Sequence, residues 1–151
     1  MDSISFEPYD EKYLELSWKW LRDPELKQLT LTPDFDRESQ RNWFDSLNNK
    51  EDYFLFGVLY DGKAIGVCGL KNIANNEGEY WGYIGEKSYW GKGIGKNMLD
   101  HIISFAITRN LSSIFLKVWS GNTRAINLYK KNGFKIISEK ENLCIMNKLL
   151  K

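Results

Sequence analysis

A glycine-rich stretch, Gly91-Lys92-Gly93-Ile94-Gly95-Lys96, has the residue types and spacing that most suggest chemistry. It lies between a strand-like and a helix-like segment, so its backbone N–H groups can converge at the positive end of a helix dipole. That arrangement suits a pyrophosphate, with Lys92 and Lys96 adding positive charge at the rim. The alternative is an ordinary tight turn with solvated lysines, and the glycines alone do not decide between the two.

Two common phosphate-binding motifs do not fit this stretch. A dinucleotide-binding GxGxxG that starts at Gly91 requires glycine where Lys96 stands. A Walker GxxxxGK[ST] that ends at Gly95-Lys96 requires glycine at Trp90 and a hydroxyl at Asn97. The spacing therefore argues against both of these nucleotide-binding classes.

Few other side chains suggest reactivity. Cys68 and Cys144 fall in strand-like apolar segments without CxxC spacing, which predicts buried free thiols. His101 is the only histidine and lies off the apolar stripe of its helix, which predicts a solvated or rim position rather than a catalytic one. No spacing brings Cys68 and His101 together as a nucleophilic pair, and we predict no metal site.

The elements that must position the glycine stretch follow from hydrophobic periodicity. Residues 95–109 predict a helix with one apolar stripe, formed by Met98, Leu99, Ile102, Ile103, Ala106 and Ile107. Residues 79–84 and 114–119 are typical of strands on either side of that helix. A strand–helix–strand unit of this kind predicts a parallel strand pair with a right-handed crossover.

The rest of the chain continues to alternate strand and helix signals. Asp23-Pro24 is expected to break the first helix, and a polar connection is expected over residues 71–78. The remaining predicted elements are a strand over 4–8, helices over 13–21, 38–47 and 123–132, a hairpin of strands 53–60 and 64–70, and strands over 134–137 and 143–150. This order describes an α/β (α+β) fold, a mixed sheet with helices packed on its faces.

Length and composition limit the classes of protein. The 151 residues, 42% hydrophobic and 27% charged, suit a single domain over 1–151. Because 21 Lys and Arg balance 20 Asp and Glu, the net charge of +1 provides no field for gathering nucleic acid. No apolar run approaches the length of a membrane helix, and the opening residues lack the pattern of a signal peptide, so we expect a cytoplasmic protein with no membrane partner.

Three segments resemble the GNAT superfamily of acetyl-CoA-dependent N-acetyltransferases. The stretch from Gly91 to Gly95 resembles its pyrophosphate loop, usually written Q/R-x-x-G-x-G/A, and residues 122–134 resemble its following motif. Residues 79–85 look like the family strand that precedes the loop. The likeness covers residues 54–140, and the N-terminal third matches only in the order of its elements. Trp90 departs from the usual Gln or Arg, as in the branch that includes ribosomal-protein and small-amine acetyltransferases.

The resemblance implies a GNAT-like, mostly antiparallel central sheet with one parallel pair and helices on both faces. It also implies a V-shaped opening between strands 79–84 and 114–119 that takes acetyl-CoA as cosubstrate. The pantetheine arm would pair along the backbone of Tyr83, Ile84 and Gly85, and the side chain of Asn122 would bind the pantetheine or its thioester end. The implied cofactor contacts are completed by Ala125 in the same motif and by Gly91, Lys92, Gly93, Ile94, Gly95 and Lys96, whose amides would hold the pyrophosphate.

The resemblance also implies two catalytic residues. Tyr129 matches the position whose phenol protonates the departing thiolate, and its alternative role is core packing beside Leu128. Glu79 stands where a carboxylate often acts as a base through water, and its alternative role is structural or solvated. An amine with the pKa of lysine costs roughly 4 to 5 kcal/mol to neutralise at pH 7, so the need for a base depends on the acceptor.

The acceptor site is the least constrained feature. The resemblance places it between residues 30–37, the start of the second predicted helix and the strand connections. The acidic side chains of Asp34, Asp36 and Glu38 are candidates for attracting a cationic amine. Four aromatic residues are candidates for stacking on a sugar or nucleotide, with ordinary core packing as the alternative: Trp18, Trp20, Phe35 and Trp43.

We therefore predict transfer of an acetyl group by direct attack of a small-molecule primary amine. An amino sugar on a nucleotide carrier stands ahead of a polyamine or an antibiotic as the acceptor. The alternatives are a protein N-terminal acetyltransferase of the ribosomal-protein type and a non-catalytic acyl-CoA-binding module. The apolar strand expected over residues 143–150 offers an edge for a homodimer.

Overall fold

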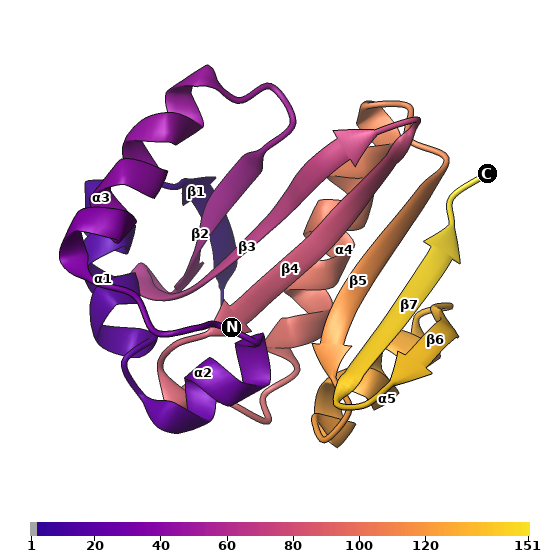
Figure 1. The fold of residues 1–151 in the computed structure, drawn as a ribbon. Helices are drawn as coiled ribbons and strands as arrows, with labels where there is room; N and C mark the ends of the chain where they lie inside the picture. Colours follow the sequence, from indigo (N-terminus) through magenta and orange to yellow (C-terminus); the bar gives the residue numbers. More distant parts are fainter. Residues whose placement is uncertain (1–2) are drawn as a thin grey trace.

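A single sheet organises the protein. The computed structural model describes residues 3–151 and contains seven strands in the order β1-β2-β3-β4-β5-β7-β6 (Figure 1). Neighbouring strands pair antiparallel except β4 and β5, which are parallel, so the predicted mixed sheet is confirmed. Met1 and Asp2, part of the domain expected over 1–151, lie outside the described residues. The strands are β1 (Ile4–Pro8), β2 (Phe54–Tyr60), β3 (Lys63–Ala74), β4 (Glu77–Ile84), β5 (Ser113–Trp119), β6 (Lys135–Lys140) and β7 (Leu143–Leu149).

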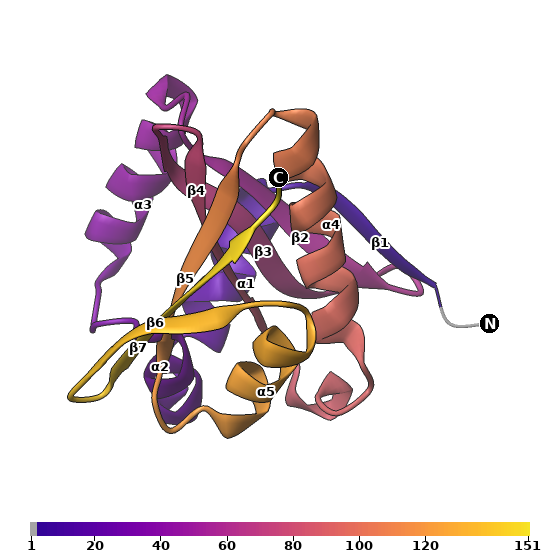
Figure 2. The ribbon, with the colours of Figure 1, turned by 90° about the vertical axis from the view of Figure 1, so that its right-hand side faces the viewer.

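Helices cover both faces of the sheet, as predicted (Figure 2). The α-helices are α1 (Glu11–Trp20), α2 (Pro24–Thr30), α3 (Arg37–Ser46), α4 (Ile94–Thr108) and α5 (Thr123–Lys131), with short 3₁₀ turns at Leu47–Asn49 and Lys87–Tyr89. α4 and α5 pack on one face, and α1 and α2 pack on the other. None of the helices described between residues 3 and 151 has the length and apolar character that a membrane crossing requires.

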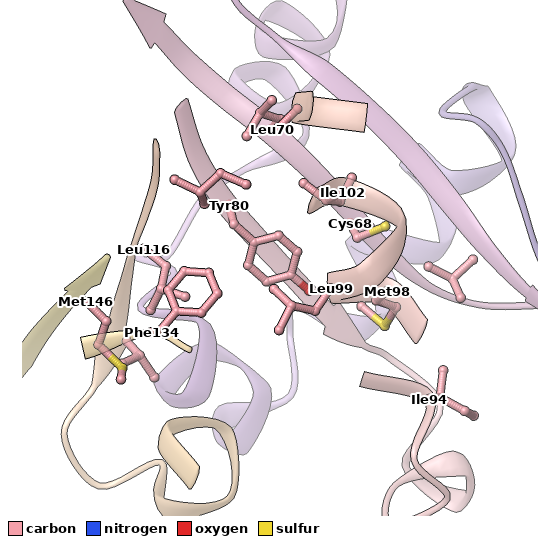
Figure 3. Close-up of a cluster of buried hydrophobic side chains, with 14 of the residues drawn as sticks. Cys68, Leu70, Tyr80, Ile94, Met98, Leu99, Ile102, Leu116, Phe134 and Met146 are labelled. Carbon is pink, nitrogen blue, oxygen red and sulfur yellow. The ribbon is translucent and has the colours of Figure 1, made fainter. Parts of the chain in front are cut away.

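The main core lies between α4 and the sheet (Figure 3). The predicted apolar stripe of α4 is largely correct, because Met98, Leu99 and Ile102 are buried there. Ile107 is the exception, since it is 53% exposed in the last turn of the helix. Cys68 and Cys144 are free and buried in this core, as predicted.

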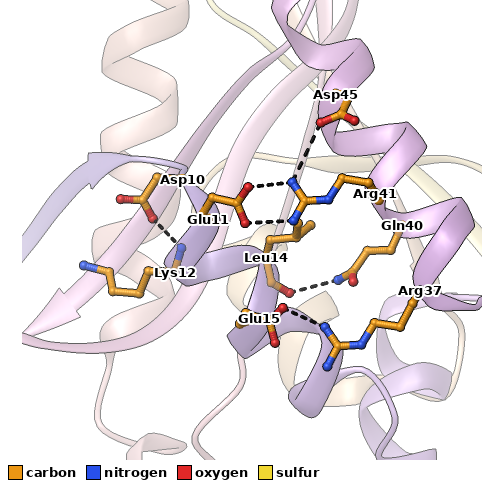
Figure 4. A network of polar contacts seen from close by, with 9 residues as sticks. All are labelled: Asp10, Glu11, Lys12, Leu14, Glu15, Arg37, Gln40, Arg41 and Asp45. Atoms are coloured by element: carbon orange, nitrogen blue, oxygen red, sulfur yellow. Dashed lines mark hydrogen bonds and ion pairs between the residues drawn. The ribbon is translucent and has the colours of Figure 1, made fainter.

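Polar contacts fix α3 on the outer side of α1 (Figure 4). The guanidinium of Arg41 donates two hydrogen bonds to the carboxylate of Glu11. The amide of Gln40, which is buried, donates to the carbonyl of Leu14 at 2.9 Å. Gln40 therefore satisfies its own polar group and holds the two helices in one relative position.

The segment after α1 differs from the prediction. Asp23-Pro24 ends one helix as expected, but it also begins α2, which the sequence analysis missed. Asp23 caps α2 by accepting a hydrogen bond from the amide of Leu26 at 3.0 Å, and Pro24 occupies the first helical turn. Proline is favourable there because its missing N–H would have had no intrahelical partner.

The polar connection expected over residues 71–78 is also wrong. β3 continues to Ala74 and β4 starts at Glu77, so the two strands form a long hairpin. Asn75 and Asn76 make its turn with φ of 55° and 63°, the left-handed values that a tight hairpin turn requires. The hairpin places Lys71 directly opposite Glu79 on the neighbouring strand.

The strand that was expected to offer a free edge for a homodimer is not at an edge of the sheet. β7 lies between β5 and β6, so the strand expected over residues 143–150 already has a partner on each side. The free edges belong to β1 and β6. The proposed route to a homodimer through β7 is therefore wrong.

Candidate active site

β4 and β5 separate soon after they begin to pair. Their parallel register runs from Glu77 opposite Ser113 to Glu79 opposite Phe115 and then ends. Beyond that point a cavity of about 690 Å³, here called cavity A, opens between the two strands. Its walls come from α2, the exposed edge of β4, the loop before α4, and α5.

The glycine stretch forms one end of cavity A. Gly91 and Gly93 both have φ of 79°, and nothing lies within 4 Å of the position where a Cβ would stand. Gly93 is the N-cap of α4, and no side chain caps this helix. The first amides of a helix have no intrahelical acceptor, so those of Ile94, Gly95 and Lys96 are available to an anion.

The lysines of this stretch contribute little fixed charge. Lys92 is exposed, and Lys96 pairs with Asp100 one turn further along α4, with 2.8 Å between Nζ and Oδ2. Gly95 has a packing role, because a Cβ there would stand 3.1 Å from Leu128 of α5. Backbone amides rather than lysine side chains therefore make this end of the cavity suitable for a pyrophosphate.

The open edge of β4 presents specific backbone groups. In an antiparallel pair, the backbone groups of every second residue bond to the neighbouring strand. The N–H of Gly85 donates to the carbonyl of Ile65 at 2.8 Å, so it is Gly85 and the residues two and four positions before it whose backbone groups face β3. The backbone groups of Tyr83 therefore face β3, whereas those of Gly82 and Ile84 face cavity A. The geometry favours Gly82 and Ile84 as backbone partners, where the sequence interpretation names Tyr83, Ile84 and Gly85.

Trp90 explains how the loop tolerates the loss of the usual Gln or Arg. Its indole N–H donates to the carbonyl of Ile84 at 2.8 Å. This bond ties the end of β4 to the start of the glycine stretch, and it confirms that the Ile84 carbonyl points away from β3.

α5 supplies the opposite wall of cavity A. The side-chain oxygen of Asn122 caps this helix by accepting from the amide of Ala125 at 3.2 Å, which leaves its NH₂ group as a donor. Tyr129 packs against Tyr80 and Phe134, and it also lines cavity A. Burial raises the pKa of the Tyr129 phenol to about 12.

Glu79 stands at the point where the strands separate and lines a second hollow, cavity B, of about 520 Å³. Glu79 is only 5% exposed. Its carboxylate accepts a hydrogen bond from the side-chain amide of Asn72 at 2.9 Å. Asn72 reaches it because its own φ is 52°, next to an irregularity in the pairing of β3 with β4.

Cavity B lies on the face of the sheet that carries α1 and α3. It meets cavity A at four residues that line both: Thr30, Trp81, Tyr83 and Lys117. The position of cavity B agrees with the acceptor region expected from the sequence, because residues 30–33 and Phe35, Ser39 and Trp43 form its outer wall. A chain of hydroxyls crosses its inner wall: Tyr9 donates to Ser17 at 3.3 Å, and Ser17 lies 2.9 Å from the Tyr83 hydroxyl.

The acidic residues expected to attract an amine do not line cavity B. Asp34 pairs with Lys27, and Asp36 caps α3 through the amide of Ser39. Glu38 is exposed on the first turn of α3. All three therefore belong to the surface or to the helix caps.

Two of the four aromatic residues predicted to stack on the acceptor do not line cavity B. Trp20 is buried beneath β4, where its indole donates to Glu86 at 2.6 Å. Trp18 packs edge-on against Phe35 and beneath Arg37 without lining the cavity. Phe35 and Trp43 do line it.

Lys71, which was not predicted from the sequence, lines cavity B opposite Glu79. Its Nζ lies 5.3 Å from the centre of the Trp81 ring. Burial lowers the pKa of Lys71, although the nearby Glu79 carboxylate opposes that effect, and the charge of Lys117 adds to the lowering. Lys71 and Asn72 fall in the stretch interpreted as a polar connection, so the only available signal was their polarity within an apolar run.

His101, predicted to be solvated or at a rim rather than catalytic, is half-buried and lines neither cavity. It stacks on Phe6, with 3.9 Å between ring centres, and meets Phe56 edge-on. Its Nε2 is buried without a hydrogen-bond partner within residues 3–151. The same described residues bring no group of three or more His, Cys, Asp or Glu side chains together for a metal ion.

Comparisons with known proteins agree with this geometry. The model of the acetyltransferase (GNAT) family matches residues 8–134. Acetyltransferase PseH of Campylobacter jejuni is 29% identical over 137 residues, which cover 89% of this chain and 85% of that protein. A domain from Methanocaldococcus jannaschii has a TM-score of 0.90 at 20% identity, over 99% of this chain and 100% of the other. The structure of C. jejuni PseH with acetyl coenzyme A has a TM-score of 0.78 at 21% identity, over 99% and 100%.

Proposed function

Because the chain belongs to the acetyltransferase (GNAT) family, we propose that it acetylates the primary amine of a small molecule, with a nucleotide-linked amino sugar as the first candidate. The chain is an acetyl-CoA-dependent N-acetyltransferase. The observation that carries the proposal is the separation of β4 from β5 after Glu79, which joins a cavity with free helix amides to a second cavity on the face of the sheet that carries α1 and α3.

Cavity A is the proposed site for acetyl-CoA. The uncapped amides at the start of α4 suit its pyrophosphate, and the open strand edge at Gly82 and Ile84 suits the amides of its pantetheine arm. The NH₂ group of Asn122 lines the same cavity beside Ala125 and supports a role for Asn122 as a donor to this arm. When bound, acetyl-CoA supplies an activated acetyl thioester for attack by an amine.

Tyr129 is the proposed general acid. A phenol with an ordinary pKa of about 10 is already protonated at neutral pH, as a group that donates a proton to a departing thiolate must be, and burial raises the pKa of Tyr129 further.

Glu79 is the proposed base. An ammonium group must lose a proton before its nitrogen can attack, and Glu79 is the only carboxylate that lines cavity B among the described residues. The single hydrogen bond from Asn72 fixes the orientation of its carboxylate. Asn72 is therefore a proposed positioning residue.

Cavity B is the proposed acceptor site. Phe35, Trp43 and Trp81 offer aromatic surfaces for a sugar or a base, which supports a nucleotide-linked amino sugar. An N-terminal peptide is the second candidate for the acceptor. A non-catalytic acyl-CoA-binding module is the alternative from a different class, and the buried Glu79 beside the opening argues against it.

The proposal is tested by incubating the protein with acetyl-CoA and separate pools of nucleotide amino sugars, polyamines, aminoglycosides and N-terminal peptides. Free thiol and the mass of each acceptor are followed together. We expect thiol release that depends on one pool, with one acetyl group added to the acceptor. Tight binding of acetyl-CoA without transfer in any pool would favour the binding module.

A further inference from the structure

Lys71 is a partly buried cation that lies near the Glu79 carboxylate without forming an ion pair with it. It makes no ion pair with any carboxylate of residues 3–151. Glu79 lies opposite it on β4, but the carboxylate of Glu79 turns to Asn72 instead. Most lysines at a protein surface keep their charge in water, whereas Lys71 is held over Trp81 on the wall of cavity B.

The charges lining cavity B have a definite pattern. Lys71, Glu79 and Lys117 stand on the adjacent strands β3, β4 and β5 and line the same hollow, so two cations flank one anion. Of the other acidic groups of this region, Asp34 pairs with Lys27, Asp36 caps α3 and Glu38 is exposed, and none of them lines cavity B. A polycationic acceptor would therefore meet one attractive and two repulsive groups.

Resting on the proposed function, we infer that the acceptor of cavity B carries an oxyanion close to its reactive amine, and that Lys71 is the specificity-determining residue that binds this oxyanion. The amine then lies toward Glu79, and a carboxylate or phosphate lies toward Lys71. The cross-strand separation of Lys71 and Glu79 sets how far apart the two groups of the acceptor stand. This chemistry disfavours polyamines.

Binding is the first readout, because it does not depend on turnover. The intact protein is loaded with CoA, and quenching of its tryptophan fluorescence is followed as probes enter the cavity that Trp43 and Trp81 line. Glucosamine 1-phosphate is compared with glucosamine, β-alanine with β-alaninamide, and spermidine serves as the polycation. The two pairs separate a phosphate from a carboxylate.

Three variants assign the effect to Lys71. Lys71→Met removes the charge with little change in length, and Lys71→Arg keeps the charge. Lys135→Met, on the exposed strand β6, is the matched control for loss of a strand lysine. An unchanged affinity for acetyl-CoA shows that each variant is folded.

We expect at least one oxyanion probe to bind the wild-type protein about tenfold or more tightly than its uncharged partner, as charge-assisted hydrogen bonds commonly provide. That ratio should fall to near one in Lys71→Met and persist in Lys71→Arg and Lys135→Met. Equal ratios in Lys71→Met and wild type, no preference within either pair, or tightest binding of spermidine would each overturn the inference. An oxyanion preference without acetyl transfer to any pool would support the inference and count against the proposed function.

Discussion

The proposed role of Tyr129 as a general acid depends on its hydroxyl group. Tyr129→Phe removes only the hydroxyl and keeps the packing against Tyr80 and Phe134. Loss of a general acid commonly costs about 100-fold or more, so we expect kcat to fall by that factor while the affinity for acetyl-CoA is kept. Thiol release and calorimetry measure the two quantities. Tyr89→Phe, which lines neither cavity, should behave as wild type, and an unchanged kcat in Tyr129→Phe would assign Tyr129 to packing alone.

His101 predicts a pH dependence of stability. Burial lowers its pKa below the usual value of about 6.5. As the pH falls below 6.5, the unfolded chain binds a proton that the folded chain does not yet bind, so the free energy of unfolding decreases until the pH passes the folded pKa. His101→Phe keeps a ring beside Phe6 and removes this proton.

Denaturant titrations of wild type and His101→Phe between pH 7.5 and pH 5 measure the effect. We expect the variant to lose less stability than wild type on acidification, since carboxylates titrate alike in both. A stability difference that stays constant with pH would show that His101 binds its proton equally in both states.

Individual site residues differed in how far the sequence could predict them. Tyr129, Asn122 and the glycines belong to local motifs, and their placement follows from one turn or one helix. Lys71 and Asn72 become part of a site only through the register of β3 against β4, which depends on a turn several residues away. The hydrophobic pattern and the turn together set such a register, and it was not predicted because residues 71–78 were interpreted as a polar connection rather than as part of a hairpin.

At the scale of the element, the turn into α4 carries its own prediction. Gly93→Ala places a side chain at φ of 79°, a conformation that costs an L-residue about 1 to 2 kcal/mol. Gly62→Ala in the β2–β3 turn is a matched control, because Gly62 has φ of 84° and equally open surroundings. We expect similar losses of stability in both variants, measured by denaturation, but weaker acetyl-CoA binding only in Gly93→Ala. Equal acetyl-CoA affinity in both would remove the loop from the proposed site.

The elements that the sequence missed have a common physical reason. α2 and the extension of β3 both lie in polar segments with turn-forming residues, which predict loops when taken alone. In α2 the proline stands where helices accept it, and in the hairpin two consecutive asparagines adopt left-handed φ. Tertiary contacts then stabilise the helix and the longer strand over a loop: Leu26 of α2 is buried beside Tyr83, and Leu70 of β3 is buried in the main core.

At the scale of the molecule, the strand order creates the site. Among the strands described in residues 3–151, only β4 and β5 pair parallel. Their crossover carries the glycine turn and α4 to the end of the sheet where the two strands have separated. The antiparallel hairpin on the other side of β4 brings Lys71 and Asn72 to Glu79. The strand–helix–strand pattern predicted the parallel pair and its crossover, and the resemblance implied the opening between the two strands. The second arrangement was not predicted from the sequence.

Because the walls of cavity A come from segments as distant in sequence as α2 and α5, only the folded chain offers the whole site. A ligand that binds only the folded state, present at a free concentration of about 100 times its Kd, stabilises that state by about 2.7 kcal/mol. For a chain of this size each kcal/mol raises Tm by about 2 to 4 °C, so saturating acetyl-CoA should raise Tm by about 5 to 10 °C. Thermal unfolding measures this shift.

S-acetyl-N-acetylcysteamine, a thioester without a pyrophosphate, should shift Tm far less, because it cannot reach the amides at the start of α4. Equal shifts with both thioesters would mean that the glycine turn contributes nothing to binding, and Gly93→Ala should then show the full acetyl-CoA shift as well.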